Sequence, residues 1–209
     1  MEKSVDAVIF DLGGVLLNLD YSLTEKAFID LGIEDFGSIY SQLNQTNLFD
    51  QFEIGKVSPF HFVNRLLDKL PSGRNANQVV HAWNAMILDF PKERMEWLEE
   101  FGKTKRIFLL SNTNDLHVTA VRAALTKSVG HGNLEDYFEK TYFSCTMGSR
   151  KPNVECFEQV LSENNLDPER TLFIDDSPQH IEGAKMVGLQ AVLLERGRDV
   201  RDALNHIVP

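Results

Sequence analysis

The stretch FDLGGVLLNLD, residues 10–20, decides the fold and raises the question of function. It completes the apolar run VDAVIF (Val5–Phe10), so Asp11 stands directly after a strand-like segment and before a Gly-Gly turn. A run of this kind, apolar on both faces, is typical of a buried strand in a parallel sheet. Asp11 is therefore either a nucleophile beside backbone that binds an anion, or a polar residue that closes a strand before glycines suited to positive φ.

Strand-like and helical segments alternate along the rest of the chain. Helical patterns occupy Pro152–Asn164, with Pro152 at the helix start, and Gln179–Val187, which Gly188 terminates. This alternation predicts an α/β fold with a doubly wound parallel sheet, whose chemistry lies at the carboxyl ends of the strands. The later strands are predicted at RIFLL (Arg106–Leu110), TYFSC (Thr141–Cys145), TLFI (Thr171–Ile174) and QAVLL (Gln190–Leu194).

The interval between the first two strands is far longer than one crossover helix requires. It contains helical patterns at 23–31, 58–70 and 77–87, with Ser58 as N-cap of the second, and a polar stretch at 41–47. We therefore predict a Rossmann-like core formed by residues 1–17 and 90–209, with residues 18–89 inserted as a helical cap. Such a cap would sit over the carboxyl edge of the sheet.

Polar residues follow four of the predicted strands. Taken singly, each group also has a structural interpretation. The residues at 11–14 could form a tight turn, and Ser111 could cap a helix. Lys151 could be a solvated charge, and Asp175 could be an N-cap with Asp176 as its neighbour. Asp175 and Asp176, however, are adjacent carboxylates at the end of a buried strand, and a divalent cation is the usual reason to tolerate their repulsion. Because carboxyl ends of parallel strands share one edge, the four groups together predict a single site. They are Asp11-Leu12-Gly13-Gly14, Ser111-Asn112, Arg150-Lys151-Pro152 and Asp175-Asp176.

In these residues, and in their order, the chain resembles the haloacid dehalogenase (HAD) superfamily, in which Mg²⁺-dependent phosphatases that form a phosphoaspartate predominate. The predicted insertion resembles the helical first-type (C1) cap of that superfamily. The segments FDLGGVLL, LLSNTN, MGSRKP and FIDDSPQHIEGA most resemble the branch that contains sugar-phosphate phosphatases, including α-glucose-1-phosphate phosphatases.

The resemblance implies a role for each residue. Asp11 is implied as the nucleophile, and Lys151 as the cation that neutralises charge at Asp11 and the phosphate. The phosphoryl oxygens would be held by Lys151, the Ser111 hydroxyl and the backbone amides of Leu12, Gly13 and Asn112. Mg²⁺ would be bound by Asp11, Asp176 and the Gly13 carbonyl, with Asp175 acting through water.

The chain departs from the resemblance at Gly13, where most phosphatases of the superfamily carry a second aspartate as general acid and base. Three consequences stay open: a leaving group that needs little protonation, such as an anomeric or acyl phosphate; a substitute such as Asp20 or a polar cap residue; or low activity. In the predicted cap, residues 48–55 read as a loop from which Phe52 and Glu53 could contact a sugar. Phe49 and Phe52 are each better explained singly as part of the small core of the cap.

Composition narrows the class of function. The net charge is −10, with 31 acidic and 21 basic residues, which argues against non-specific nucleic-acid binding. The N-terminus does not read as a signal peptide, no apolar run reaches membrane-spanning length, and Cys145 and Cys156 imply no disulfide framework. We therefore expect a cytoplasmic monomer or homodimer that acts on a small phosphorylated metabolite, without a nucleic-acid or membrane partner.

Two alternatives remain at this point. A 2-haloacid dehalogenase shares the fold and the aspartate nucleophile but attacks carbon, and it would not need the adjacent pair Asp175-Asp176. A catalytically weakened phosphate-binding or regulatory protein would explain Gly13, but it would have no use for Asp11, Lys151 and both aspartates together.

Overall fold

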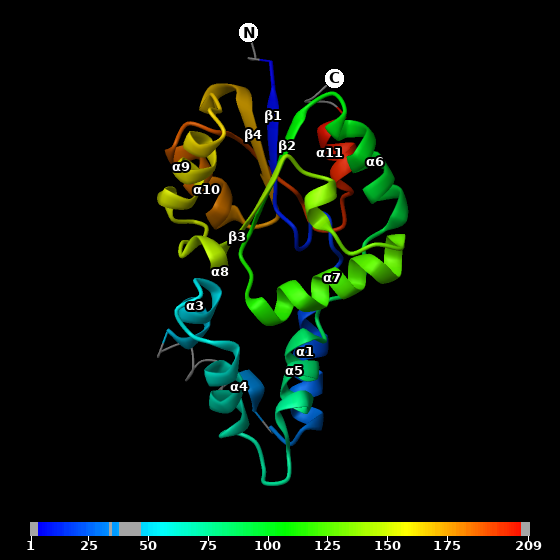
Figure 1. Cartoon of the computed structure of the whole chain (residues 1–209), viewed down its shortest axis with the longest axis vertical. Helices are drawn as coiled ribbons and strands as arrows, with labels where there is room; N and C mark the ends of the chain where they lie inside the picture. The colour runs from blue at the N-terminus through cyan, green and yellow to red at the C-terminus, as the bar shows by residue number, and fades with distance from the viewer. Residues whose placement is uncertain (1–3, 34, 38–46, 206–209) are drawn as a thin grey trace.

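The computed structural model describes residues 4–33, 35–37 and 47–205 of the chain. Within them, five parallel strands form one sheet in the order β3-β2-β1-β4-β5 (Figure 1). This arrangement confirms the predicted α/β fold with a parallel, doubly wound sheet. The strands are β1 (Ala7–Phe10), β2 (Arg106–Ser111), β3 (Lys140–Phe143), β4 (Thr171–Asp175) and β5 (Gln190–Leu193).

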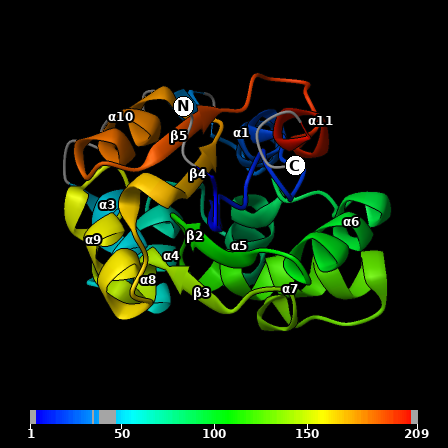
Figure 2. The same cartoon turned by 90° about the horizontal axis from the view of Figure 1, so that it is seen from above.

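Helices cover both faces of the sheet (Figure 2). Both faces need this cover because successive residues of a strand point to opposite faces, and these strands are apolar on both. They are α6 (Lys92–Gly102), α7 (Asp115–Val129), α9 (Val154–Glu163), α10 (Pro178–Met186) and α11 (Val200–Leu204). Ile9 of β1 packs with residues of α9 and α10, whereas its neighbour Phe10 packs with residues of α6, α7 and α11. The central strand is therefore buried on both faces, as its unbroken apolar run predicts.

The third strand ends earlier than the apolar run TYFSC predicts. β3 stops at Phe143, and Ser144–Met147 form the short helix α8. The Ser144 hydroxyl accepts a hydrogen bond from Thr113 N at 2.8 Å and donates one to Thr113 O at 2.9 Å. Because the backbone beyond Ser111 of β2 is thus paired with a side chain, the β2–β3 ladder ends there.

The start of α9 also differs from the prediction. The helix begins at Val154 after Asn153, and Pro152 lies in the preceding loop, where the Lys151–Pro152 peptide bond is cis. This loop is fixed from outside, because the side chain of Asn112 bonds both backbone groups of Lys151 at 2.9 Å. The predicted stop after α10 is confirmed, since Gly188 has a φ of 84°.

A helical insertion lies between β1 and β2 and projects from the carboxyl end of the sheet (Figure 1). Its described helices are α1 (Tyr21–Asp30), α3 (Leu48–Glu53), α4 (Pro59–Leu67) and α5 (Ala76–Asn84). They bury a separate apolar core around Phe28, Phe62 and Trp83. Ser58 caps α4 by accepting a hydrogen bond from His61 N at 3.3 Å, as predicted. The polar stretch at 41–47 lies outside the described residues except for Asn47.

Two short extended segments connect this insertion to the core. Asn18 N donates to Asp89 O, and Asp20 N donates to Met86 O, both at 2.9 Å. The entering and leaving chains therefore run side by side in opposite directions. The boundaries predicted for the cap, residues 18 and 89, fall within this pairing and stay a prediction.

The segment 48–55 is not the loop that its mixed composition predicts. Most of it forms α3, and the Phe52 side chain is 1% exposed. Its ring stacks on Phe62 with the centroids 4.0 Å apart. The prediction that Phe52 contacts substrate is therefore wrong, because packing within the insertion buries it. Among the described residues, no helix has the length and apolar character needed to cross a bilayer.

Candidate active site

The predicted site residues from three strands meet at the carboxyl edge of the sheet. β1 lies between β2 and β4, with Phe10 in register with both Leu109 and Ile174. Asp11 and Asp175 consequently leave the sheet at the same level, and the two chains are joined by a hydrogen bond from Asp11 N to Ile174 O at 2.9 Å. Ser111 closes β2 beside them and is buried.

Lys151 connects the carboxylates. Its Nζ lies 2.6 Å from Asp11 Oδ1 and 2.7 Å from Asp175 Oδ2, and its side chain is fully buried. Burial alone would lower the pKa of Lys151, but Asp11 and Asp175 outweigh burial and raise it. Lys151 is therefore a buried ammonium group that donates to two carboxylates. Its paired burial contradicts the solvated-charge interpretation that its place beside Arg150 allows.

The two carboxylates that bind Lys151 differ in their environment. Burial raises the pKa of Asp11 against the opposing effect of Lys151, and the charge of Asp175 adds to the rise. Burial acts on Asp175 as well, but Lys151 and His180 outweigh it and lower its pKa. Asp175 also accepts a hydrogen bond from Ser177 N at 2.8 Å. Asp175 is thus the firmly ionised partner, and Asp11 is a carboxylate with few competing hydrogen bonds.

His180 belongs to this network, although nothing in the sequence predicted a role for it. Its Nδ1 lies 3.0 Å from both oxygens of Asp175. The contact arises because His180 lies in the first turn of α10, which begins directly after the Asp175-Asp176 pair. No spacing rule in the sequence marks this contact.

The third carboxylate, Asp176, completes a candidate cation site. Oxygen atoms of Asp11, Asp175 and Asp176 all lie within 4.8 Å of one another, and Asp176 is the exposed member of the three. Burial and the charge of Asp175 raise the pKa of Asp176. Gly14 has a φ of 76°, and a Cβ at that position would overlap Asp176 Oδ2. These hard oxygen donors, held close together despite their repulsion, fit Mg²⁺.

Asn112 contributes to the site in a way that the sequence did not predict. Its Nδ2 donates to Lys151 O and its Oδ1 accepts from Lys151 N, both at 2.9 Å. The side chain therefore positions Lys151. A phosphate contact by Asn112, as the resemblance implies, rests on its backbone N–H.

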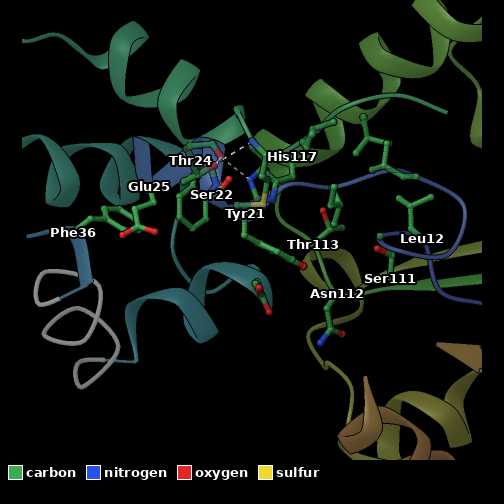
Figure 3. A pocket seen from close by; sticks show the side chains of 18 of the residues that line it. Leu12, Tyr21, Ser22, Thr24, Glu25, Phe36, Ser111, Asn112, Thr113 and His117 are labelled. Carbon is green, nitrogen blue, oxygen red and sulfur yellow. Dashed lines mark hydrogen bonds between the residues drawn. The ribbon is translucent and has the colours of Figure 1, made fainter. Parts of the chain in front are cut away.

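A cavity of about 480 Å³ opens beside these residues, between the strand ends and the helical insertion. Figure 3 shows Leu12, Ser111 and Thr113 on one side, with Ser22 and Thr24 of α1 on the other. Of the described residues that line it, none is Lys or Arg. The apolar lining residues are Leu12, Leu17, Leu19, Phe36, Trp83, Met86, Ile87 and Val121, and the acidic ones are Glu25 and Glu53.

The space beside Gly13 is filled by a side chain of the same loop. A Cβ on Gly13 would lie 2.5 Å from Leu19 Cδ1. Asp20 does not supply the missing acid, because it caps α1 by accepting hydrogen bonds from Ser22 N at 3.0 Å and Ser22 Oγ at 2.6 Å. These bonds lower its pKa. The suggestion that Asp20 replaces the acid is therefore wrong.

Glu53 lines the cavity from the end of α3, as its predicted role requires. Its Oε2 lies 3.0 Å from Arg150 Nε, off the direction of a hydrogen bond, so both atoms are buried without a hydrogen-bond partner. Arg150 also pairs with Asp50 of α3. Arg150 thereby joins the loop that carries Lys151 to the helical insertion. No pattern in the sequence marks this pairing, since Arg150 and Asp50 are 100 positions apart.

Residues 5–188 match the haloacid dehalogenase-like hydrolases, and the chain belongs to this family. The D-ribitol-5-phosphate phosphatase of Bacteroides thetaiotaomicron is 29% identical over 201 residues, covering 96% of this chain and 97% of that protein. A phosphorylated carbohydrates phosphatase of Thermotoga maritima is 27% identical and covers 90% of this chain and 84% of its own length. The predicted family and its hydrolase class are thus confirmed.

Solved structures give the same result. A HAD family enzyme of Bacteroides thetaiotaomicron, in complex with magnesium and inorganic phosphate, has a TM-score of 0.87 and 31% identity, over 96% of this chain and 99% of that one. A predicted HAD-like hydrolase of Porphyromonas gingivalis has a TM-score of 0.86 and 28% identity, over 98% of both chains. A 2-haloacid dehalogenase of Pseudomonas syringae, at 21% identity and a TM-score of 0.60 over 90% of this chain and 86% of that one, shares the fold alone.

Proposed function

We propose that this protein is a Mg²⁺-dependent phosphatase of small phosphorylated sugars or polyols and that it acts through a phosphoaspartate. The observation that carries the proposal is the triad in which buried Lys151 lies within 2.7 Å of both Asp11 and Asp175, with Asp176 close by. A dehalogenase has no need of this third carboxylate. The magnesium and phosphate complex of the Bacteroides relative supports the same assignment.

In this proposal Asp11 attacks phosphorus with a carboxylate oxygen, and the bond from phosphorus to the leaving oxygen breaks. Lys151 holds Asp11 in position and neutralises part of the charge on the phosphoryl oxygens. The hydroxyl of Ser111 and the backbone amides of Leu12, Gly13 and Asn112 hold those oxygens. Mg²⁺, bound by Asp11, Asp176 and the Gly13 carbonyl with Asp175 behind them, would offset the repulsion between carboxylate and phosphate. Water then hydrolyses the acyl-phosphate and regenerates Asp11.

The cavity supports a neutral leaving group. Its described lining contains two carboxylates and no cationic side chain, so a second phosphate or a carboxylate on the substrate would have no partner there. The names of the two curated relatives, a ribitol-phosphate and a carbohydrate-phosphate phosphatase, fall in the same chemical class. Within this class we assign sugar 1-phosphates as the preferred substrates. The core carries no acid at Gly13, and an anomeric oxygen then leaves more readily than the oxygen of a primary alcohol.

A phosphate-release screen tests this function. Purified protein would be assayed with glucose 1-phosphate, glucose 6-phosphate, ribitol 5-phosphate, nucleotides and acetyl phosphate, each with Mg²⁺ and with EDTA. We expect Mg²⁺-dependent release, with the 1-phosphate turned over faster than the 6-phosphate. The reverse order overturns the assignment of anomeric substrates, and release that is indifferent to EDTA overturns the metal-dependent mechanism.

A further inference from the structure

We propose that Glu53, carried into the site by the helical insertion, is the general acid and base that replaces the aspartate missing at Gly13. This inference rests on the proposed function and names a residue that the phosphatase reaction needs. An alkoxide is a poor leaving group, and proton donation in the transition state accelerates such reactions by roughly 10²–10⁴-fold. The core cannot supply the group at position 13, where Leu19 fills the space that a side chain would take.

His117 lines the same cavity but cannot act as the donor. Its Nε2 lies 3.2 Å from Trp83 O, so this nitrogen donates to the carbonyl. Its Nδ1 lies 3.2 Å from Asn114 Nδ2 and accepts from that amide, while Asn114 Oδ1 accepts from His117 N at 3.0 Å. Both ring nitrogens of the neutral ring are therefore occupied.

The carboxylate of α1 that lines the cavity, Glu25, is poorly placed for the task. It lies exposed on this helix. In Figure 3 Glu25 lies beside Phe36, at the opposite end of the cavity from Ser111 and Leu12. A proton donor must reach the oxygen bonded to phosphorus, next to the strand ends, which Glu25 does not do.

Glu53 meets both requirements. It lines the cavity together with Ser111 and Asn112, and its Oε2 is buried without a hydrogen bond in the described structure. The Glu53 side chain is nevertheless 28% exposed, so a carboxyl group held at Oε2 beside Arg150 can offer its other oxygen to an atom of the substrate. Burial raises the pKa of Glu53, although Arg150 opposes the rise. Because Arg150 Nε lies 3.0 Å from Oε2, the Arg150 guanidinium can stabilise the Glu53 carboxylate that proton transfer leaves behind.

The proposed steps balance as follows. As Asp11 forms its bond to phosphorus and the ester bond breaks, the Glu53 carboxyl gives its proton to the departing oxygen, which leaves as an alcohol. The Glu53 carboxylate then takes a proton from a water molecule as that water attacks the phosphoaspartate. The bond between phosphorus and Asp11 breaks, inorganic phosphate leaves, and Glu53 is again protonated.

The test compares leaving groups in three proteins: wild type, Glu53→Gln and the control Asp50→Asn. Asp50 also pairs with Arg150 and lies in α3, but it does not line the cavity. We expect Glu53→Gln to lower kcat/KM for glucose 6-phosphate by about 100-fold, and for acetyl phosphate, whose leaving group needs no proton, by less than about fivefold. Asp50→Asn should keep the wild-type ratio between the two substrates.

Equal losses on both substrates, or no loss on either, with a melting temperature close to that of wild type, would overturn the role of Glu53. The same change of ratio in Asp50→Asn would also overturn it, because the effect would then come from the contact between α3 and the core. If wild type released phosphate from neither substrate, the proposed function itself would fail, and this inference with it. Wild-type activity on acetyl phosphate therefore separates the two failures.

Discussion

The charges of the individual residues at the candidate site do not balance. Asp11, Asp175 and Asp176 bring three carboxylates together, and Lys151 provides one positive charge within hydrogen-bond distance of two of them. Removing one partner of such a buried pair typically costs about 3–5 kcal/mol of stability. The excess negative charge is what a divalent cation would neutralise. The cluster of three carboxylates and Lys151 therefore fits the binding of a cation better than a purely stabilising role.

His117 makes a prediction about pH and stability. Burial lowers its pKa from 6.5 to about 4 in the folded chain. Between these values the unfolded chain binds a proton that the folded chain does not, so the free energy of unfolding falls as the pH drops from about 6.5 to 4. The loss attributable to His117 is up to about 3 kcal/mol.

Urea unfolding of wild type and His117→Gln at pH 7 and pH 4.5 measures this effect. The variant should lose distinctly less stability on acidification than wild type. The exposed His61 of α4 is the control, and His61→Gln should behave as wild type does. An identical acid loss in wild type and His117→Gln would show that His117 does not drive it.

Single elements bring the insertion against the core. The turn after α3 approaches α8 so closely that a Cβ on Gly55 would overlap the backbone carbonyl oxygen of Cys145. Arg150 crosses the same interface to Asp50 and Glu53. Helix α3 therefore brings Glu53 to the cavity by means of a close backbone contact and an ion-pair cluster.

This contact predicts different effects for two glycines that have almost the same φ. Gly55 has a φ of 72° and Gly148 a φ of 73°, but no atom lies within 4 Å of a Cβ built on Gly148. Gly148→Ala should therefore cost only backbone strain, about 1 kcal/mol. Gly55→Ala should cost the same strain and also displace α3 from α8, so that kcat/KM for sugar phosphates falls by about tenfold or more. Melting curves and kinetics of both variants check the prediction, which equal kinetics in the two would contradict.

The sequence predicted the sheet and the strand-end residues because both depend on local pattern. Apolar runs mark buried strands, and Asp11, Ser111 and Asp175 follow directly from where those runs end. It could not predict the roles of Arg150, Asn112 and His180, which depend on contacts between segments far apart or on the orientation of a helix. The interpretations of residues 48–55 as a loop and of Ser144 and Cys145 as strand failed because tertiary contacts decided those segments.

At the scale of the whole molecule, the proposed function places the leaving group in the cavity between the sheet edge and the helical insertion. The cavity of about 480 Å³ holds a molecule of sugar size, and its described lining offers carboxylates and apolar side chains but no cation. In the proposed function the phosphate to be cleaved lies at the strand ends, where Lys151 would neutralise part of its charge. A second anionic group would face Glu25 or Glu53 instead.

Charge selection follows as a prediction. We expect kcat/KM for glucose 1-phosphate to exceed that for glucose 1,6-bisphosphate by at least about tenfold, since an unpaired anion in the cavity costs more than 1.4 kcal/mol. Glu25→Lys, at the exposed end of the cavity, should lower the ratio of kcat/KM for glucose 1-phosphate to kcat/KM for glucose 1,6-bisphosphate. Assays of both substrates with both proteins measure it. A wild type that prefers the bisphosphate would show that the cavity does not exclude a second anion.

The proposed role of Asp11 as the nucleophile of a phosphatase is tested by Mg²⁺-dependent phosphate release by wild type and Asp11→Asn on the same substrate. Because Asp175 keeps Lys151 paired in the variant and burial disfavours the ionised form of Asp11, the neutral isostere should fold normally, which a melting temperature close to that of wild type would verify. Asp30→Asn, at the exposed end of α1, serves as control and should retain full activity. We expect Asp11→Asn to lose at least about a thousandfold in kcat; a folded Asp11→Asn protein that still turns over substrate at the wild-type rate would contradict the phosphoaspartate mechanism.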